Sequence, residues 1–173
     1  FVTPEMFGTY RYGSELLNVT FDPTRAGEIA SYAYDDEGTR AERTHLVKDG
    51  ILLRPLGGAL SQARSGLAGV ANARATSWNR PPIDRMANLN LEPGTSSLDE
   101  MIRAVERGVY METNCSWSID DSRNKFQFGC ERGRLIENGT LTRVVKKPNY
   151  RGVSASFWRS LAMVGAPDTV ETL

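Results

Sequence analysis

Two acidic clusters are the residues of this sequence whose types and spacing come nearest to catalytic chemistry. Asp35, Asp36 and Glu37 are consecutive, and Asp120-Asp121 forms a second pair. Neighbouring carboxylates can act as general acid and base or bind a hard cation. The first cluster lacks the spacing of an Asp-x-Asp-x-Asp-Gly calcium loop, and aspartate favours turns because its carboxylate bonds to nearby backbone N–H groups. We therefore expect turn formation over catalysis at both clusters, more strongly at Asp120-Asp121.

Histidine and cysteine are too few to build a catalytic centre of the familiar kinds. His45 is the single histidine of the sequence, which excludes a histidine-rich metal site and gives no nucleophile a basic partner. Cys115 and Cys130 could form a disulfide or a metal pair. We favour two reduced cysteines packed as small apolar groups, because small disulfide-dependent domains are richer in cysteine. The glycines at Gly57-Gly58 do not form a phosphate-binding motif.

Composition sets the broad class of the protein. At 173 residues with 40% hydrophobic and 24% charged content, the chain fits one globular domain or a domain of a longer chain. The 21 basic residues balance the 21 acidic ones, so the sequence lacks the basic excess of a nucleic-acid binder. We find no apolar run long enough for a membrane span and no signal peptide. We expect a cytoplasmic fragment of a longer protein, without nucleic acid or membrane as a partner.

Two Asx-Gly pairs organise the elements that must position these side chains. Asn138-Gly139 stands between the runs Gly133–Ile136 and Leu141–Val145, and Asp49-Gly50 stands in a related setting upstream. Both central residues of a type I′ turn need positive φ, so an Asx-Gly pair between such runs is a strong hairpin signal. The sequence therefore predicts two hairpins.

Three helices are predicted from periodicity and caps. Gly57–Gly69 has helical spacing but is rich in glycine, so its helix should be short. In Leu98–Arg107 a capping box of Ser97 and Glu100 precedes the apolar face, and Gly108 should take the left-handed position after its end. Ala155–Val164 is the third.

Short runs bounded by turn residues predict about eight or nine strands. The segments outside the two hairpins are Leu16–Phe21, Ile29–Tyr34, Met86–Leu91, Val109–Glu112, Trp117–Ile119 and Phe126–Phe128. Strands that follow one another in hairpins, rather than alternating with helices, favour an α+β fold. We expect a mainly antiparallel, strongly curved or barrel-like sheet with about three helices.

Taken in order, several short elements resemble the C-terminal domain of the TldD/PmbA family, once described as modulators of DNA gyrase. The resemblance extends from about Ile29 to Gly165. The matching elements are Asp35-Asp36-Glu37-Gly38-Thr39, Arg43-Thr44, Val47-x-Asp49-Gly50-x-Leu52, Leu60–Gly69 with Arg64, Arg85-Met86-x-Asn88, Ile102-x-x-Val105-x-x-Gly108-Val109-Tyr110, Phe126-x-Phe128, Leu135-Ile136-Glu137-Asn138-Gly139, Val144-x-Lys146 and Met163-Val164-Gly165. We assign residues 1–28 to a linker and first strand, and 29–173 to the family-like domain.

The resemblance implies a zinc-dependent peptidase that hydrolyses peptides or unfolded polypeptides. TldD-type subunits carry a His-Glu-x-x-x-His helix and a later cysteine as zinc ligands. Three protein ligands leave a fourth position for water, whose pKa falls toward about 7. This sequence contains neither motif, and Cys115 and Cys130 lack the Cys-Gly-Lys context expected of the cysteine ligand. We expect the histidines before Phe1 and the cysteine beyond Leu173, so that zinc belongs to the full-length protein and this chain alone is inactive.

The resemblance also implies a role for the domain and for five of its residues. We expect a substrate-channel and dimerisation domain that pairs with a PmbA-like subunit or a second copy. Asp35, Asp36, Glu37, Arg85 and Asn88 are the candidate residues for binding the peptide substrate. The alternative is a non-catalytic PmbA/TldE-like partner domain that acts only in assembly. Two stretches depart from the family pattern, Val70–Ala73 and Thr113–Asp121, which leaves the choice of substrate open.

Overall fold

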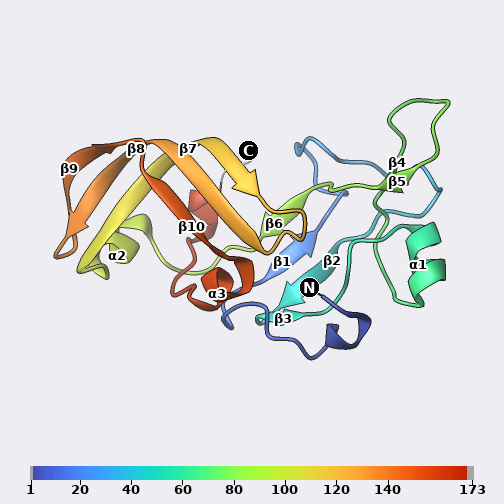
Figure 1. Cartoon of the computed structure of the whole chain (residues 1–173), viewed down its shortest axis with the longest axis horizontal. Helices are drawn as coiled ribbons and strands as arrows, with labels where there is room; N and C mark the ends of the chain where they lie inside the picture. Colours follow the sequence, from blue (N-terminus) through green and yellow to red (C-terminus); the bar gives the residue numbers. More distant parts are fainter. Residues whose placement is uncertain (1, 171–173) are drawn as a thin grey trace. The chain divides into compact units, whose positions relative to one another are not determined.

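The computed structural model describes residues 2–170. These residues form two compact units, which we call the N-terminal unit (residues 2–92) and the C-terminal unit (from residue 93 on). Three α-helices and ten strands lie within the described range, and every strand pair is antiparallel. Figure 1 shows these elements in chain order. The α+β class, the antiparallel pairing and the three helices agree with the sequence prediction.

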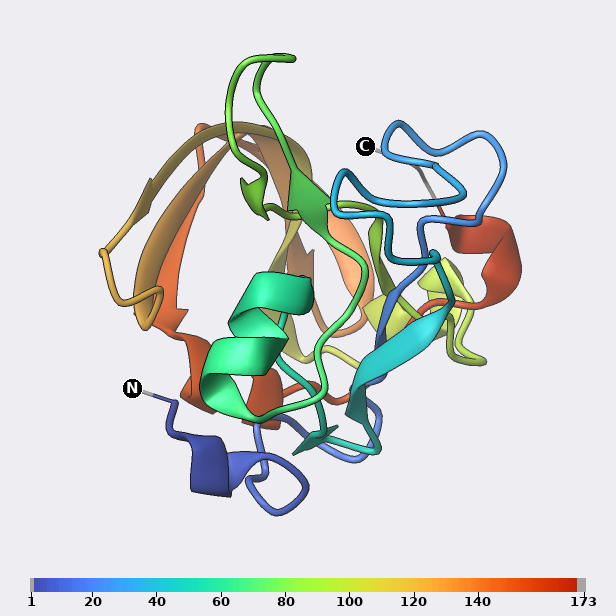
Figure 2. The same ribbon diagram turned by 90° about the vertical axis from the view of Figure 1, so that its right-hand side faces the viewer.

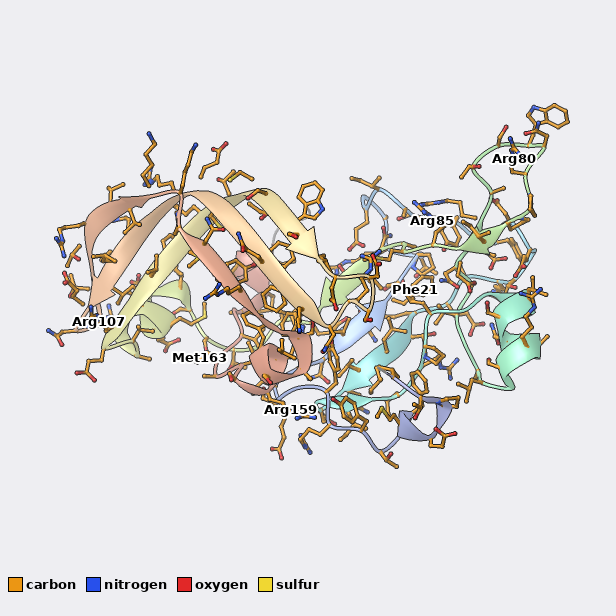
Figure 3. All side chains as sticks on the ribbon, viewed as in Figure 1. Phe21, Arg80, Arg85, Arg107, Arg159 and Met163 are labelled. Atoms are coloured by element: carbon orange, nitrogen blue, oxygen red, sulfur yellow. The ribbon has the colours of Figure 1, made fainter. Side chains whose placement is uncertain are left out.

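The N-terminal unit contains a four-stranded sheet with the order β3-β2-β1-β6. Its strands are β1 (Val19–Phe21), β2 (Thr44–Lys48), β3 (Ile51–Leu52) and β6 (Leu89–Leu91). Phe21, Leu46 and Val70 are the buried centre of the unit, and partly buried side chains from Tyr32, Leu56, Ala87 and Leu89 pack around them. Figure 3 labels Phe21 on β1. The unit also holds the 3-10 turn Pro4–Met6, α1 (Ala59–Ser65) and a two-stranded ribbon of β4 (Ala73–Arg74) and β5 (Ile83–Asp84).

The first predicted hairpin is confirmed. Asp49 has φ 49° and Gly50 has φ 77°, as a type I′ turn requires, and β2 and β3 pair on either side. The turn is held by backbone bonds, since the Gly50 carbonyl accepts from the Tyr12 N–H at 2.8 Å and the Gly50 N–H donates to the Leu17 carbonyl at 3.0 Å. A local turn signal is thus reinforced by a loop earlier in the chain.

The C-terminal unit is built on a long meander of β7 (Arg107–Ile119), β8 (Lys125–Glu137), β9 (Thr140–Lys146) and β10 (Asn149–Val153). β7 lies along one edge of β8, and β9 followed by β10 lies along the other. The second predicted hairpin is confirmed, because Asn138 and Gly139 join β8 to β9 with φ 50° and 72°. One bulge interrupts the β7–β8 register, between Asn114 and Ser116. The strands predicted separately in this region are therefore parts of two longer ones.

Four aromatic side chains of the C-terminal unit cluster where β8 begins. The rings of Phe126, Phe128, Tyr150 and Phe157 have neighbouring centroids 5.2 to 6.0 Å apart. Phe157 comes from α3 (Ser154–Arg159), so this cluster attaches the helix to the sheet. Offset and edge-on aromatic pairs are worth about 0.5–1.5 kcal/mol beyond the area that they bury.

The helix α2 (Leu98–Arg103) has the predicted capping box, but it is shorter than predicted. The Ser97 N–H donates to Glu100 Oε2 at 2.8 Å, and the Glu100 N–H donates to Ser97 Oγ at 3.2 Å. The first of these bonds holds the pKa of the Glu100 carboxyl below its ordinary value. The prediction that Gly108 follows the helix in a left-handed conformation was wrong, because the chain enters β7 at Arg107. The predicted helix Ala155–Val164 likewise ends at Arg159.

The strongly curved or barrel-like sheet was also a wrong prediction. Both larger sheets are open, with β3 and β6 at the two edges of one and β7 at an edge of the other. Closing a sheet requires tilted strands that pair all the way round, and the N-terminal unit offers strands of only two to five residues. The predicted strand Ile29–Tyr34 is a loop with one bridge, Tyr34 to Arg40.

Within residues 2–170, each helix is too short or too polar to serve as a membrane span.

Replacing Gly139 by alanine should destabilise the C-terminal unit by about 2 kcal/mol, measured by urea unfolding. The new Cβ would stand 2.8 Å from the Arg103 carbonyl oxygen, at a residue with φ 72°. Gly66→Ala is the matched control, because Gly66 has φ 70° and open space around it. It should show only the conformational cost of about 1 kcal/mol. Equal losses for the two variants would contradict a steric contribution from the turn's contact with α2.

Candidate functional site

The candidate site begins at the tight turn formed by residues 35–39. Asp35 is 7% exposed, and its carboxylate accepts three backbone N–H groups. Oδ1 accepts from Glu37 at 3.0 Å and from Thr39 at 2.8 Å, and Oδ2 accepts from Ala73 at 3.2 Å. An aspartate in this arrangement fixes its own turn and joins it to a distant strand. Turn formation by Asp35 is therefore confirmed.

The other two acids of the cluster reach in different directions from the same turn. Asp36 is exposed, and its Oδ2 accepts from the Ala75 N–H at 2.7 Å, just beyond β4. Glu37 is half-buried, and its Oε2 accepts a long bond of 3.4 Å from the Leu60 N–H in the first turn of α1. The cluster 35–37 thus bonds to the ribbon and to the start of α1, two segments that both come much later in the chain than the cluster itself.

Asp84 is a fourth acid of this site, and the sequence analysis missed it. Its Oδ1 accepts from the Gly58 N–H at 2.6 Å, and its Oδ2 accepts from the Ser61 hydroxyl. A Cβ added to Gly58 would lie 2.7 Å from Glu37 Oε2 and 3.2 Å from Asp84 Oδ1. Two carboxylates therefore flank the same glycine at the N-terminus of α1, where backbone N–H groups favour negative charge. A side chain at position 58 would separate them.

Arg85 lies next to this site in the chain, and among the described residues only its backbone forms hydrogen bonds. The Arg85 N–H donates to the Asn72 carbonyl at 2.9 Å, and Asn72 Nδ2 donates to the Arg85 carbonyl at 3.1 Å. Asn72 is 2% exposed, and its Oδ1 has no hydrogen-bond donor among the described residues. The Arg85 side chain is exposed, and Figure 3 labels it beside β5. Its guanidinium is accessible to a ligand.

Asn88 makes its contacts with a different part of the N-terminal unit. Its Nδ2 donates to the Asp22 carbonyl at 3.2 Å and to Ser31 Oγ at 3.0 Å, and its Oδ1 accepts from the Ala30 N–H at 2.9 Å. Every polar atom of this buried side chain is satisfied. Asn88 therefore ties the loop after β1 to the start of β6. The structure brings Asp35, Asp36 and Glu37 together but does not bring Asn88 into contact with them.

Tyr32 provides the clearest electrostatic perturbation near the cluster. Its hydroxyl donates to the Ala71 carbonyl at 2.7 Å. Burial raises the pKa of the Tyr32 phenol above its ordinary value, and the negative charge of Asp35 raises it further. A phenol with a raised pKa remains protonated at neutral pH, so Tyr32 acts as a hydrogen-bond donor and not as a base.

The side chains present do not fit a zinc centre. No three side chains of histidine, cysteine, aspartate or glutamate converge to hold a metal within residues 2–170, and the acids around α1 already accept backbone N–H groups. Both cysteines are free, with Cys130 buried and Cys115 exposed. The expectation that both are packed away is therefore wrong for Cys115, which lies in the β7 bulge.

At the second acidic cluster, Asp120 Oδ1 accepts from the N–H groups of Asn124 and Lys125 at 2.8 and 2.7 Å, which confirms its turn role.

The sequence of this chain is similar to those of known metalloproteases. Residues 7–172 match a family model described as the PmbA/TldA metallopeptidase C-terminal domain. A metalloprotease of Methanocaldococcus jannaschii is 34% identical over 142 residues, covering 82% of this chain and 31% of the relative. A zinc metalloprotease TldD homolog of Saccharolobus solfataricus is 27% identical over 155 residues, covering 89% and 35%. The chain spans about a third of the length of these relatives.

A solved structure extends the comparison to the fold. The crystal structure of TldE from Thermococcus kodakarensis has a TM-score of 0.80 with this chain at 18% sequence identity. The match covers 95% of this chain and 37% of the TldE chain. The two proteins therefore share their fold over nearly all of this chain.

Proposed function

This chain belongs to the TldD/PmbA metallopeptidase family, and from that premise we propose that it forms the substrate-channel and dimerisation domain of a TldD-like zinc-dependent peptidase. The full-length protein would hydrolyse peptides or unfolded polypeptides. It would hold zinc through residues outside this chain, because the donor set described above does not form such a centre. The domain contributes binding and orientation of the polypeptide and assembly with a partner subunit.

The unpaired edge of β7 is the main support for the proposal that this domain binds a polypeptide. β7 has thirteen residues, and in the part of the chain that the structure describes it pairs with β8 alone. An unpaired edge of this length offers a row of backbone donors and acceptors to an extended peptide. Main-chain recognition of this kind tolerates many side chains, as a peptidase acting on unfolded polypeptides requires.

The candidate substrate-binding residues divide into two roles in this proposal. Asp36 and Arg85 are exposed and Glu37 is half-buried, so these three side chains can meet polar or charged groups of a polypeptide. Asp35 and Asn88 are buried with their hydrogen bonds made, so they act by holding the loops that carry the others. This division supports a positioning role for two of the five residues.

Main-chain recognition predicts a two-residue period in the response to backbone methylation. A peptide that adds as a strand turns every second N–H toward the sheet edge, and N-methylation there removes the donor. We expect the full-length protein to cleave peptides methylated at those positions at least about tenfold more slowly, a change of about 1.4 kcal/mol. Peptides methylated at the intervening positions are the matched control and should be cleaved normally. Mass spectrometry of the products gives the rates, and a response without the two-residue period would exclude strand addition.

The metal content of the full-length protein tests the enzyme assignment separately. Stoichiometric zinc with peptide hydrolysis that is lost on chelation is the expected result. A full-length protein that contains no zinc and cleaves no peptide, but forms a stable complex with a TldD-type subunit, would instead support the PmbA/TldE-like partner reading.

A further inference from the structure

The ribbon of β4 and β5 has one face turned into the N-terminal unit and one turned outward. Ala73 pairs with Asp84, and Arg74 pairs with Ile83, and side chains of paired residues lie on the same face of a sheet. Ala73 is 4% exposed, and Asp84, although exposed, bonds to the start of α1, so this pair forms the face toward α1. The outer face carries Arg74 and Ile83, and Ile83 is 52% exposed.

The loop that joins β4 to β5 carries Trp78, the most exposed large hydrophobic side chain of the described residues. Trp78 is 96% exposed, although tryptophan is usually covered to a large extent. Figure 2 shows this loop extending beyond the two strands of the ribbon, and Figure 3 labels Arg80 on it. The Arg80 N–H donates to the Ser77 carbonyl at 3.0 Å, which closes a turn around Trp78. A hollow of about 520 Å³ lies between this loop and Asp36, with Trp78, Arg80 and Pro82 in its wall.

Two arginines, Arg74 and Arg80, give this surface its positive charge. Arg74 and Arg80 are exposed and form no ion pair within residues 2–170. Asp36 also lines the hollow, where its carboxylate accepts from the Ala75 N–H, whereas Asp84 accepts from the Gly58 N–H at the start of α1. Arg80 shares the wall of the hollow with Trp78, and Arg74 pairs with Ile83 on the ribbon. Their guanidinium groups are suited to carboxylates, which arginine binds in a bidentate manner.

The loop is also stiff enough to serve as a binding element. Pro81 and Pro82 fix two φ angles and lack N–H donors. The residues before β5 therefore cannot continue the strand by forming ladder hydrogen bonds. A loop that is already ordered loses less conformational entropy when it binds a partner. Tryptophan and arginine are the residues that most often carry binding energy at protein interfaces.

We propose that Arg74, Trp78, Arg80 and Ile83, which we call the ribbon surface, form a docking site for an acidic segment of a partner protein. The segment presents carboxylates to the two arginines and an apolar side chain to Trp78 and Ile83. A nucleic acid is a poorer occupant, because the 21 basic and 21 acidic residues of the chain cancel and phosphate binding depends on a basic excess. The ribbon surface and β7 belong to different units of the chain, and the proposed docking does not require that the bound segment be cleaved.

Fluorescence anisotropy of labelled peptides binding to this chain tests the proposal. The probe is a short peptide rich in glutamate with a central leucine, and its control has glutamine in place of every glutamate. We expect the acidic probe to bind at least about tenfold more tightly than its control, with an affinity that falls as salt is added. The Trp78→Ala variant should bind the probe about tenfold more weakly. Equal binding of the two peptides would overturn the proposal.

A matched pair of double variants separates the ribbon surface from general charge. R74Q/R80Q removes two unpaired arginines from the ribbon, and R40Q/R64Q removes two exposed, unpaired arginines from elsewhere in the N-terminal unit. We expect R74Q/R80Q to weaken binding of the acidic probe about five- to tenfold and R40Q/R64Q to leave it within about twofold. Equal losses for the two double variants would overturn the proposal. Circular dichroism melting should show both variants folded, because none of the four side chains forms an ion pair within the described residues.

Two further outcomes assign the surface to a different occupant. If single-stranded oligothymidine binds as tightly as the acidic peptide and the Trp78→Ala variant loses it, the ribbon surface binds nucleic acid. If light scattering shows that this chain self-associates and Trp78→Ala abolishes the association, the occupant is a second copy. Either result would overturn the proposed acidic segment.

Discussion

Replacing Asp35 by alanine should destabilise the N-terminal unit by about 3 kcal/mol, measured by urea unfolding followed by circular dichroism. The reason is that three backbone N–H groups, those of Glu37, Thr39 and Ala73, lose their acceptor in a buried place. Each buried donor left without a partner costs about 1–3 kcal/mol, and such costs are not additive. Asp35→Asn keeps the size of the side chain but turns an NH₂ group toward one of these donors, so a loss of about 2 kcal/mol is expected.

Asp36→Asn is the matched control for this prediction. Asp36 is exposed, and one N–H, that of Ala75, donates to its carboxylate, so the loss should stay within about 0.5 kcal/mol. The pair also separates two roles for the cluster in the full-length protein. If Asp35→Asn leaves stability unchanged but weakens peptide binding, Asp35 contacts the substrate directly, and its assignment as a positioning residue is wrong.

The two Asx-Gly hairpins could be predicted from sequence because their cause is local. Asp49-Gly50 and Asn138-Gly139 need positive φ at both residues, and few other residue pairs accept it. The capping box of Ser97 and Glu100 is local for the same reason. The lengths of the strands could not be predicted in this way, because β7 continues through Thr113–Ser116 only by pairing with β8. That pairing is a tertiary contact, and the sequence pattern at this bulge carries no sign of it.

In the candidate site, too, local contacts could be predicted from the sequence and long-range contacts could not. Turn formation at Asp35 and Asp120 could be predicted, since aspartate bonds to backbone N–H groups close to it in the chain. The link from Asp35 to Ala73 and the link from Asp84 to Gly58 could not, because they join residues far apart in sequence. The one available signal was Gly58 itself, where a glycine before a helix indicates a close approach. The strand predicted at 29–34 is a loop, because the Tyr32 hydroxyl bonds to the distant Ala71 carbonyl. The weak alternation of apolar and polar residues in this segment gives no sign of that contact.

Gly69→Ala should destabilise the N-terminal unit by about 3 kcal/mol or more in urea unfolding. The segment after α1 returns past Gly57, where the Val70 N–H donates to the Gly57 carbonyl at 3.0 Å. A Cβ at position 69 would overlap the Gly57 carbonyl oxygen and stand 2.9 Å from its carbon. Both partners are backbone, so no side-chain rotation relieves the overlap, and the chain on either side must move. Val70 is part of the buried centre of the unit, which makes that movement costly.

The same displacement should reach the candidate site, and this distinguishes it from a general loss of stability. Gly57 and Gly58 precede α1, so moving them withdraws the Gly58 N–H from Asp84 and the start of α1 from Glu37. We therefore expect hydrogen exchange of the amides at 58–61 to rise in Gly69→Ala more than exchange in β1 and β2. Gly57→Ala is the matched control, because its Cβ would meet only Ser61 Cβ at 3.4 Å, an ordinary contact. If Gly57→Ala is as destabilised as Gly69→Ala, the close approach of the two backbones is not what holds α1 against the ribbon.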